Sequence, residues 1–252
     1  MDRPYKVQNG NNMPIQAPLY DSPFVPYSVP DMPTLIVYCK APPGIIEKYL
    51  EPSPFGYVSS DFIVTISDMM NTKHSNGGFY DIAIVVPIKY KDRFAGHYLF
   101  EYEQDDYCVA AGREIWGYPK KLANIFFEEK HGKVLATATK NDVEIIRLEM
   151  DLNKQAQGVI PNLVLVPHFN LQVIPNCDGP GVFLKRIISR DTTLDFVTKR
   201  EVEGFGQVKF QGIRNNPLDE FTPIEIYGAV YKVGDYFATE ENGWGKVVDV
   251  LI

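Results

Sequence analysis

The chain has 252 residues, of which 45% are hydrophobic, 13% aromatic and 23% charged. This composition can build the core of one large domain, and it excludes a disordered chain, a collagen-like chain and a disulfide-stabilised miniprotein. The net charge of −7 argues against general nucleic-acid binding, because such binding needs a basic surface that displaces the counterions of phosphates.

The first segment, residues 1–33, is predicted to be an extended, irregular N-terminal arm. Eleven of the 19 prolines lie within the first 54 residues, and proline fixes φ and removes a backbone donor. The arm also carries apolar side chains, among them Tyr20, Phe24 and Val25. We therefore expect it to pack on the body of the protein or on a neighbouring subunit.

Most of the remaining chain, residues 34–252, has the pattern of β-structure. Val, Ile, Tyr, Phe and Thr dominate a series of runs, and several runs alternate as half-buried strands do. Turn signals separate them, for example at 76–78 and 177–181. The predicted strands are residues 34–38, 61–67, 80–90, 97–102, 133–139, 143–150, 163–175, 182–189, 206–212 and 224–239.

Helix signals are few. Residues 42–51 combine a proline near the start with apolar residues at helical spacing, which predicts a short helix. The tail, residues 241–252, predicts either a short helix or a final strand. Strands do not alternate with helices as a βαβ fold requires. The sequence thus predicts one α+β domain over residues 34–252, a mainly antiparallel sheet or barrel with few helices.

The three cysteines, Cys39, Cys108 and Cys177, are far apart and form no CxxC pair, which fits a reducing compartment. Cys108 lies in the run YCVAA, which we interpret as the buried core of a strand. The histidines are isolated and predict no metal site. With no apolar stretch of membrane-spanning length and no secretory signal, we expect a cytoplasmic protein without a membrane partner.

Residues 112–125, GREIWGYPKKLANI, combine charged and aromatic residues. Pro119 disfavours helical backbone at the preceding residue, so the segment is predicted to be extended, with Lys120 and Lys121 on opposite faces. An inward lysine would be desolvated, which lowers its pKa and frees the amine as a nucleophile. The side chains expected around it are Trp116, Tyr118, Leu122 and Ile125. The alternative is a pair of solvated surface lysines.

This segment resembles the signature of the acetoacetate decarboxylase family, whose pattern is close to GRE-x-x-x-(Y)PKK. Other blocks match in the same order. Residues 37–52 resemble the family's early strand and helix, and residues 169–180 its segment that ends in IIPN-x-DG. Residues 217–231 are similar to its late segment. The resemblance covers the chain from about residue 34 to the end.

The resemblance implies a β-rich, cone-like barrel that forms a homo-oligomer and uses a lysine Schiff base without metal or organic cofactor. Lys120 matches the family's Schiff-base lysine, and Lys121 matches the neighbour that is credited with perturbing its pKa in acetoacetate decarboxylase itself. Asp81 falls where the family has an acidic residue. The family's arginine before the early strand is missing, and Asp31 or a near neighbour occupies that region.

The remaining motif residues are expected to be structural or to orient the substrate. These are Arg113, Glu114, Trp116 and Tyr118. For Arg113 and Glu114, a buried structural ion pair is the main alternative to a role in catalysis. We also expect desolvation, more than Lys121, to depress the pKa of Lys120.

The implied function is decarboxylation of a short β-keto acid, acetoacetate, to acetone and CO2. Two alternatives stay open: a Schiff-base aldolase-dehydratase that acts on pyruvate and an aldehyde, and a non-catalytic binding protein that keeps the fold. A cation that holds the ionised carboxylate would raise the barrier to its loss. The missing arginine and the charge of Asp81 therefore favour decarboxylation over aldol chemistry.

Overall fold

The computed structural model describes residues 11–73, 76–192 and 196–252, and β-strands dominate it. The strands are β1 (Tyr27–Lys40), β2 (Gly56–Tyr57), β3 (Asp61–Asp68), β4 (Tyr80–Tyr90), β5 (Arg93–Glu103), β6 (Lys120–Leu122), β7 (Asn124–Lys130), β8 (Lys133–Lys140), β9 (Val143–Asp151), β10 (His168–Pro175), β11 (Val182–Arg190), β12 (Phe196–Phe210), β13 (Glu225–Ala238) and β14 (Lys246–Val250). The helices are α1 (Ile45–Leu50), α2 (Asp106–Trp116) and the short 3-10 helix η2 (Leu218–Phe221).

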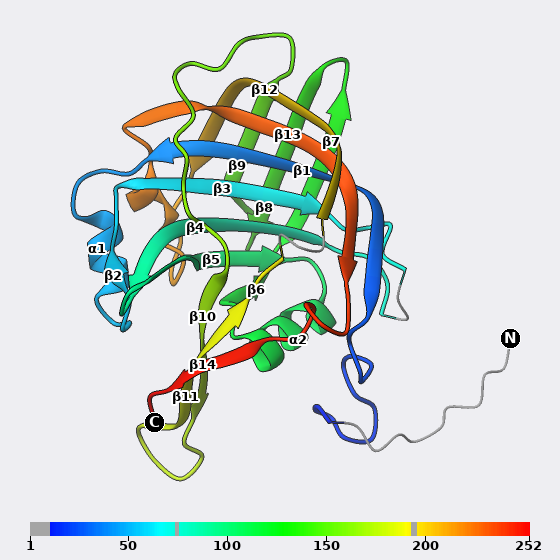
Figure 1. The fold of residues 1–252 in the computed structure, drawn as a ribbon, viewed down its shortest axis with the longest axis vertical. Helices are drawn as coiled ribbons and strands as arrows, with labels where there is room; N and C mark the ends of the chain where they lie inside the picture. The colour runs from blue at the N-terminus through cyan, green and yellow to red at the C-terminus, as the bar shows by residue number, and fades with distance from the viewer. Residues whose placement is uncertain (1–10, 74–75, 193–195) are drawn as a thin grey trace, which may run out of the picture.

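These strands form one large sheet in the order β14-β11-β10-β5-β4-β3-β1-β13-β12-β9-β8-β7, with β2 paired to β4 and β6 paired to β5. Figure 1 shows β13, β1, β3, β4 and β5 stacked one above another, with α2 below them. Nearly all pairings are antiparallel, and β5 pairs in parallel with both β10 and β6. The mainly antiparallel fold is confirmed. Among the described residues β14 and β7 do not pair, so hydrogen bonds do not close the sheet into a barrel.

The core lies where the central strands are covered on both faces. In β4 the run Ile82–Ile88 is buried throughout, and such a continuous apolar run is typical of a strand without a solvent face. Helix α1 adds Ile46 and Leu50 to the same cluster. Each fully buried aliphatic side chain of this kind stabilises the fold by about 1.5–3 kcal/mol.

The N-terminal arm differs from the prediction after residue 26. Strand β1 begins at Tyr27 and pairs with β13, although Pro30 and Pro33 lie within it. The pairing register shifts between Val29 and Met32, and an irregularity of this kind lets a strand tolerate a proline that cannot donate to the ladder. Residues 1–10 of the predicted arm lie outside the described residues.

The clearest error of prediction is helix α2. Cys108 is buried, as expected, but it lies in this helix and not in a strand. The helix ends at Gly117, which has φ 71°, the left-handed conformation typical of a helix C-terminus. Strand β7 and residues 196–205 of β12 were also missed, whereas the tail forms strand β14, one of its two predicted alternatives. Within the described ranges, no helix has the length and apolarity required to cross a membrane.

A buried histidine joins the two halves of the sheet at the parallel contact of β5 with β10. The Nδ1 atom of His97 lies 2.8 Å from the backbone oxygen of Phe169, to which it donates a hydrogen bond as Nδ1–H. Burial lowers the pKa of His97 to about 4. The imidazole is therefore neutral in the folded protein at pH values where the unfolded chain would already bind a proton, below about 6.5.

We predict that this histidine makes the protein less stable as the pH falls from about 6.5 to about 4, by up to about 1.4 kcal/mol per pH unit. His97→Gln should therefore show a shallower loss of unfolding free energy over this range in urea titrations. His131→Gln, at an exposed residue, is the matched control. Identical pH slopes for wild type and His97→Gln would contradict the prediction.

Candidate active site

The predicted inward lysine is Lys120. After helix α2 ends at Gly117, the chain turns into β6, which runs parallel to β5 and places Lys120 beside Glu101. Lys120 is only 7% exposed. Alternation along the strand directs Lys121 to the other face, as the sequence predicts.

Three carboxylates surround the amine of Lys120. Its Nζ is 3.2 Å from Asp81 Oδ2, 3.2 Å from Glu101 Oε1 and in direct contact with Glu103 Oε1. Glu101 and Glu103 share a face of β5, and Asp81 on β4 is the register partner of Glu103. Like charges at directly opposite positions of a sheet repel, so the lysine is the counter-charge that this group of carboxylates requires.

The charge balance at Lys120 reverses one prediction. Burial is the largest single influence and lowers its pKa, but Glu101 and Asp81 outweigh it, and the pKa of Lys120 is raised above its usual value. The expectation of a depressed pKa is therefore wrong for this state of the protein, because it did not include Glu101 and Glu103. Burial also raises the pKa of Glu101 well above its usual range.

Lys121 takes no part in this cluster. Its Nζ donates to the backbone oxygen of Asn215 at 2.6 Å and to Asn216 Oδ1 at 3.1 Å. The main influences on the pKa of Lys120 are its burial and the nearby carboxylates, and Lys121 is not among them. Through these hydrogen bonds, Lys121 links β6 to the loop at residues 215–216.

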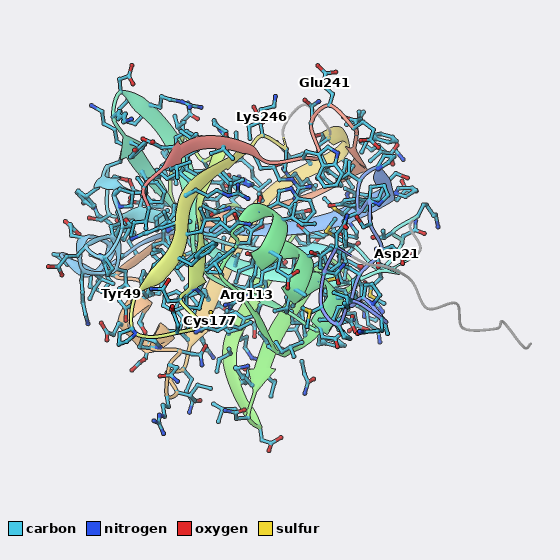
Figure 2. The ribbon with its side chains drawn as sticks, turned by 90° about the horizontal axis from the view of Figure 1, so that it is seen from below. Asp21, Tyr49, Arg113, Cys177, Glu241 and Lys246 are labelled. Carbon is cyan, nitrogen blue, oxygen red and sulfur yellow. The ribbon has the colours of Figure 1, made fainter. Side chains whose placement is uncertain are left out.

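The GRE residues lie at the edge of the site. Arg113 and Glu114 are both exposed, so the expectation of a buried ion pair between them is wrong. Arg113 Nη1 donates to the backbone oxygen of Lys120 at 3.3 Å, and Glu114 accepts a hydrogen bond from the Tyr20 hydroxyl at 2.8 Å. Figure 2, which views the molecule from below, labels Arg113 on helix α2, to which it belongs. Both residues support the site from outside.

Lys120 and its carboxylates line a cavity of about 530 Å³. Trp116 and Tyr118 also line it, as predicted, and the Tyr118 hydroxyl lies 2.9 Å from His168 Nδ1. Burial lowers the pKa of His168 to about 3, so its ring is neutral near pH 7. The other two side chains expected around the lysine are not there: Leu122 is 45% exposed, and Ile125 packs against the main core.

Sequence reasoning missed most of the cavity lining, including Glu101, Glu103, His168 and Arg190. The two glutamates had a usable signal, because they alternate with Phe100 and Tyr102 in an otherwise apolar strand. Arg190 had no such signal, because β11 carries other basic residues and nothing in the sequence distinguishes Arg190 from them. It lies in the cavity although the region of Asp31 has no arginine, and Asp31 itself pairs with Lys199 outside the cavity.

The three carboxylates are also the one set of described residues that could hold a cation between them. Their nearest oxygen atoms all lie within 4.8 Å of one another. The ammonium group of Lys120 already contacts all three, so it occupies the position from which a cation would bind them. The arrangement suits a positively charged nitrogen, whether an ammonium or an iminium group.

The chain matches the family described as Acetoacetate decarboxylase (ADC) over residues 12–242. Among curated relatives, the acetoacetate decarboxylase of Burkholderia multivorans is 26% identical over 243 residues, which cover 94% of this chain and 93% of the relative. The acetoacetate decarboxylase of Burkholderia cenocepacia gives the same values.

Solved structures share the fold. The crystal structure of acetoacetate decarboxylase from Legionella pneumophila superposes with a TM-score of 0.81 at 21% identity, over 97% of this chain and 96% of that one. The enduracididine biosynthesis enzyme MppR, complexed with the condensation product of pyruvate and imidazole 4-carboxaldehyde, gives a TM-score of 0.72 at 13% identity, over 94% and 95%. At these identities the likeness extends to the fold alone.

The glycine of the GRE motif yields a test of how Lys120 is held. A Cβ atom on Gly112 would lie 2.2 Å from Lys120 Cδ and 2.4 Å from Lys120 Cε, so α2 needs a glycine where the lysine passes. We predict that Gly112→Ala lowers acetoacetate turnover by roughly 100-fold, because a shift of about 1 Å in a reacting group has that effect.

The fold should survive this change, since alanine favours a helix by up to about 1 kcal/mol over glycine. Gly179→Ala, where a Cβ atom would meet nothing within 4 Å, is the control and should leave turnover unchanged. Wild-type turnover in Gly112→Ala would show that the lysine is not held by this contact.

Proposed function

The chain belongs to the acetoacetate decarboxylase family, and we propose that it decarboxylates a β-keto acid, of which acetoacetate is the smallest, through a Schiff base on Lys120. Family membership makes it an enzyme of the acetoacetate decarboxylase-like type, so a non-catalytic protein that keeps the fold is no longer a candidate. The observation that carries the proposal is the buried lysine amine in contact with Asp81, Glu101 and Glu103 inside the cavity.

In the proposed reaction the resting ammonium of Lys120 first passes its proton to a neighbouring carboxylate. Asp81 is the acceptor that best fits, because its side chain is 20% exposed whereas those of Glu101 and Glu103 are almost fully buried. The free amine attacks the ketone carbon. The proton held by the carboxylate then passes to the hydroxyl of the carbinolamine, which leaves as water and gives an iminium ion. Its positive nitrogen replaces the ammonium, so the same carboxylates stabilise the intermediate.

The carbon–carbon bond to the carboxylate then breaks, CO2 leaves, and the electron pair moves to the nitrogen to form an enamine. We propose that the protonated carboxyl of Glu101 supplies the proton that the enamine carbon takes up. Its Oε2 is buried and has no hydrogen-bond partner among the described residues. Hydrolysis of the resulting iminium releases the ketone and regenerates the Lys120 amine.

The acidic surroundings of Lys120 favour loss of a carboxylate. A substrate carboxylate next to this acidic cluster is destabilised before the reaction, and this repulsion disappears as CO2 forms. Schiff-base aldol chemistry on pyruvate and an aldehyde is the second candidate. One observation favours it: Arg190 lies in the cavity and could retain a carboxylate throughout a reaction.

We also propose that the protein forms a homo-oligomer and is located in the cytoplasm. Exposed apolar side chains such as Val159 (88% exposed) and Phe183 (72% exposed) support a homo-oligomer that covers them. The three free cysteines, of which Cys177 is exposed, support a reducing cytoplasmic compartment.

The direct test of the proposal is borohydride trapping. Acetoacetate followed by borohydride should inactivate the enzyme and add one reduced adduct, which peptide mass mapping should place on Lys120. Lys121→Gln is the matched control, because it changes the neighbouring lysine outside the cavity, and it should still form the adduct. An adduct on Lys121, or no adduct with any of several keto acids, would rule out this mechanism.

The pH dependence of trapping tests the role of the carboxylates. Since Asp81 raises the pKa of Lys120, Asp81→Asn should lower it, by about one unit for an opposite charge at this distance. The midpoint of the pH profile of imine formation should therefore lie at a lower pH than in wild type, while the maximal rate falls because Asp81 no longer accepts the proton. Lys121→Gln should leave the pH profile of imine formation unchanged. A shift in Lys121→Gln without a shift in Asp81→Asn would show that the neighbouring lysine sets the pKa of Lys120.

A further inference from the structure

The cavity is also lined by cationic groups that the proposed reaction does not use. Besides Lys120 and its carboxylates, Arg190 and Lys232 line it. We propose that Arg190 binds a second carboxylate, which stays on the substrate, so that the substrate is a β-keto diacid rather than acetoacetate. This inference rests on the proposed function and names the substrate class of the same site.

Arg190 is built into the protein as a buried cation with spare hydrogen-bonding capacity. It is 8% exposed, and its Nε has no hydrogen-bond partner among the described residues. Its Nη2 donates to two neutral phenols, Tyr236 at 2.8 Å and Tyr27 at 3.3 Å. No carboxylate of the described chain forms an ion pair with it. A substrate carboxylate that accepts from this buried guanidinium would form a charge-assisted hydrogen bond in a desolvated site.

Aromatic side chains fix where this cation lies relative to the lysine. The guanidinium is stacked 4.4 Å from the centre of the Trp116 ring and also influences the hydroxyl of Tyr118. The amine of Lys120 lies 5.4 Å from the centre of the Tyr118 ring. Tyr118 is therefore a neighbour of both cationic groups. A substrate that pairs with Arg190 while its ketone reacts at Lys120 needs an anionic group besides the departing carboxylate.

The size of the cavity supports the same conclusion. Its volume of about 530 Å³ equals roughly 18 water-sized volumes, far more than the four-carbon skeleton of acetoacetate fills. A longer substrate with an anionic end can reach both Lys120 and Arg190. Its ketone then lies at Lys120 and its distal carboxylate at Arg190.

Position decides which carboxylate is lost, because only the carboxylate β to the imine can pass its bonding electrons to the iminium nitrogen, and the charges around it favour the same outcome. The carboxylate β to the imine lies beside Asp81 and the glutamates, where repulsion promotes its departure. A carboxylate held by Arg190 is stabilised in its ionised form and is retained. The bond that breaks joins the α-carbon to the proximal carboxylate, and its electron pair moves to the iminium nitrogen. Arg190 forms no covalent bond and exchanges no proton.

The test compares decarboxylation of 3-oxoadipate with that of acetoacetate. Wild type should prefer 3-oxoadipate by at least tenfold in kcat/KM, and Arg190→Gln should reduce this ratio at least tenfold. Arg190→Lys, which keeps the charge, should restore part of the ratio. Arg186→Gln is the matched control on the same strand, because Arg186 contacts Gln172 and does not line the cavity. No preference in wild type, or an unchanged ratio in Arg190→Gln, would overturn the inference.

A binding measurement separates this inference from the proposed mechanism. By calorimetry, 4-oxopentanoate should bind wild type at least tenfold more tightly than neutral 2-pentanone, and Arg190→Gln should abolish the difference. Equal binding of the two ligands by wild type would contradict the role of Arg190. Absence of borohydride trapping with every ketone would instead contradict the Schiff base on Lys120, whatever the binding result.

Discussion

The structure of the site depends on the contact between one buried amine and three buried carboxylates. Asp81 and Glu103 are register partners on neighbouring strands, and Glu101 lies on the same face. Without a cation, their mutual repulsion and desolvation would oppose the pairing of β4 with β5. Lys120 provides that cation, and the whole path from helix α2 through Gly117 into β6 serves to bring it there. Removing the amine therefore affects both chemistry and stability, whereas exchanging an ammonium for an iminium keeps the balance.

This arrangement changes the usual explanation of an activated lysine. A desolvated amine beside another cation would have a low pKa and be ready to react. Here the pKa of Lys120 is raised, and Lys121 is held by Asn215 and Asn216 outside the cavity. The cluster instead stabilises the positive charge on nitrogen, first as ammonium and then as iminium. The proton that must leave before attack has a short route, because its acceptors are already hydrogen-bonded to it. Arg190, which also lines the cavity, provides a separate place for an anion.

The sequence predicted the broad fold and the lysine because both depend on local patterns. Alternating β-rich runs gave most strands, and Pro119 together with the paired lysines indicated an extended segment with one inward amine. One failure is local, and the others depend on contacts between residues far apart in the sequence. Helix α2 lacks a strong apolar period, so Cys108 could be taken for a strand residue. The pKa of Lys120 depends on Glu101 and Asp81, and Glu101 reaches it only because β6 pairs with β5. Arg190 comes from a strand 70 residues later in the chain, and only the folded sheet places it beside Trp116.

The central claim is that carboxylates, rather than a neighbouring lysine, set the charge state of the reacting amine. The most direct measurement is an NMR titration of the Lys120 side chain in the enzyme without substrate, using lysine labelled with 15N at Nζ. Lys120→Gln would assign the signal. The account predicts that the Lys120 nitrogen remains an ammonium up to and beyond pH 10.5, the ordinary lysine value from which its pKa is raised. A titration midpoint below pH 8 would contradict the account and would show that desolvation dominates the pKa of Lys120.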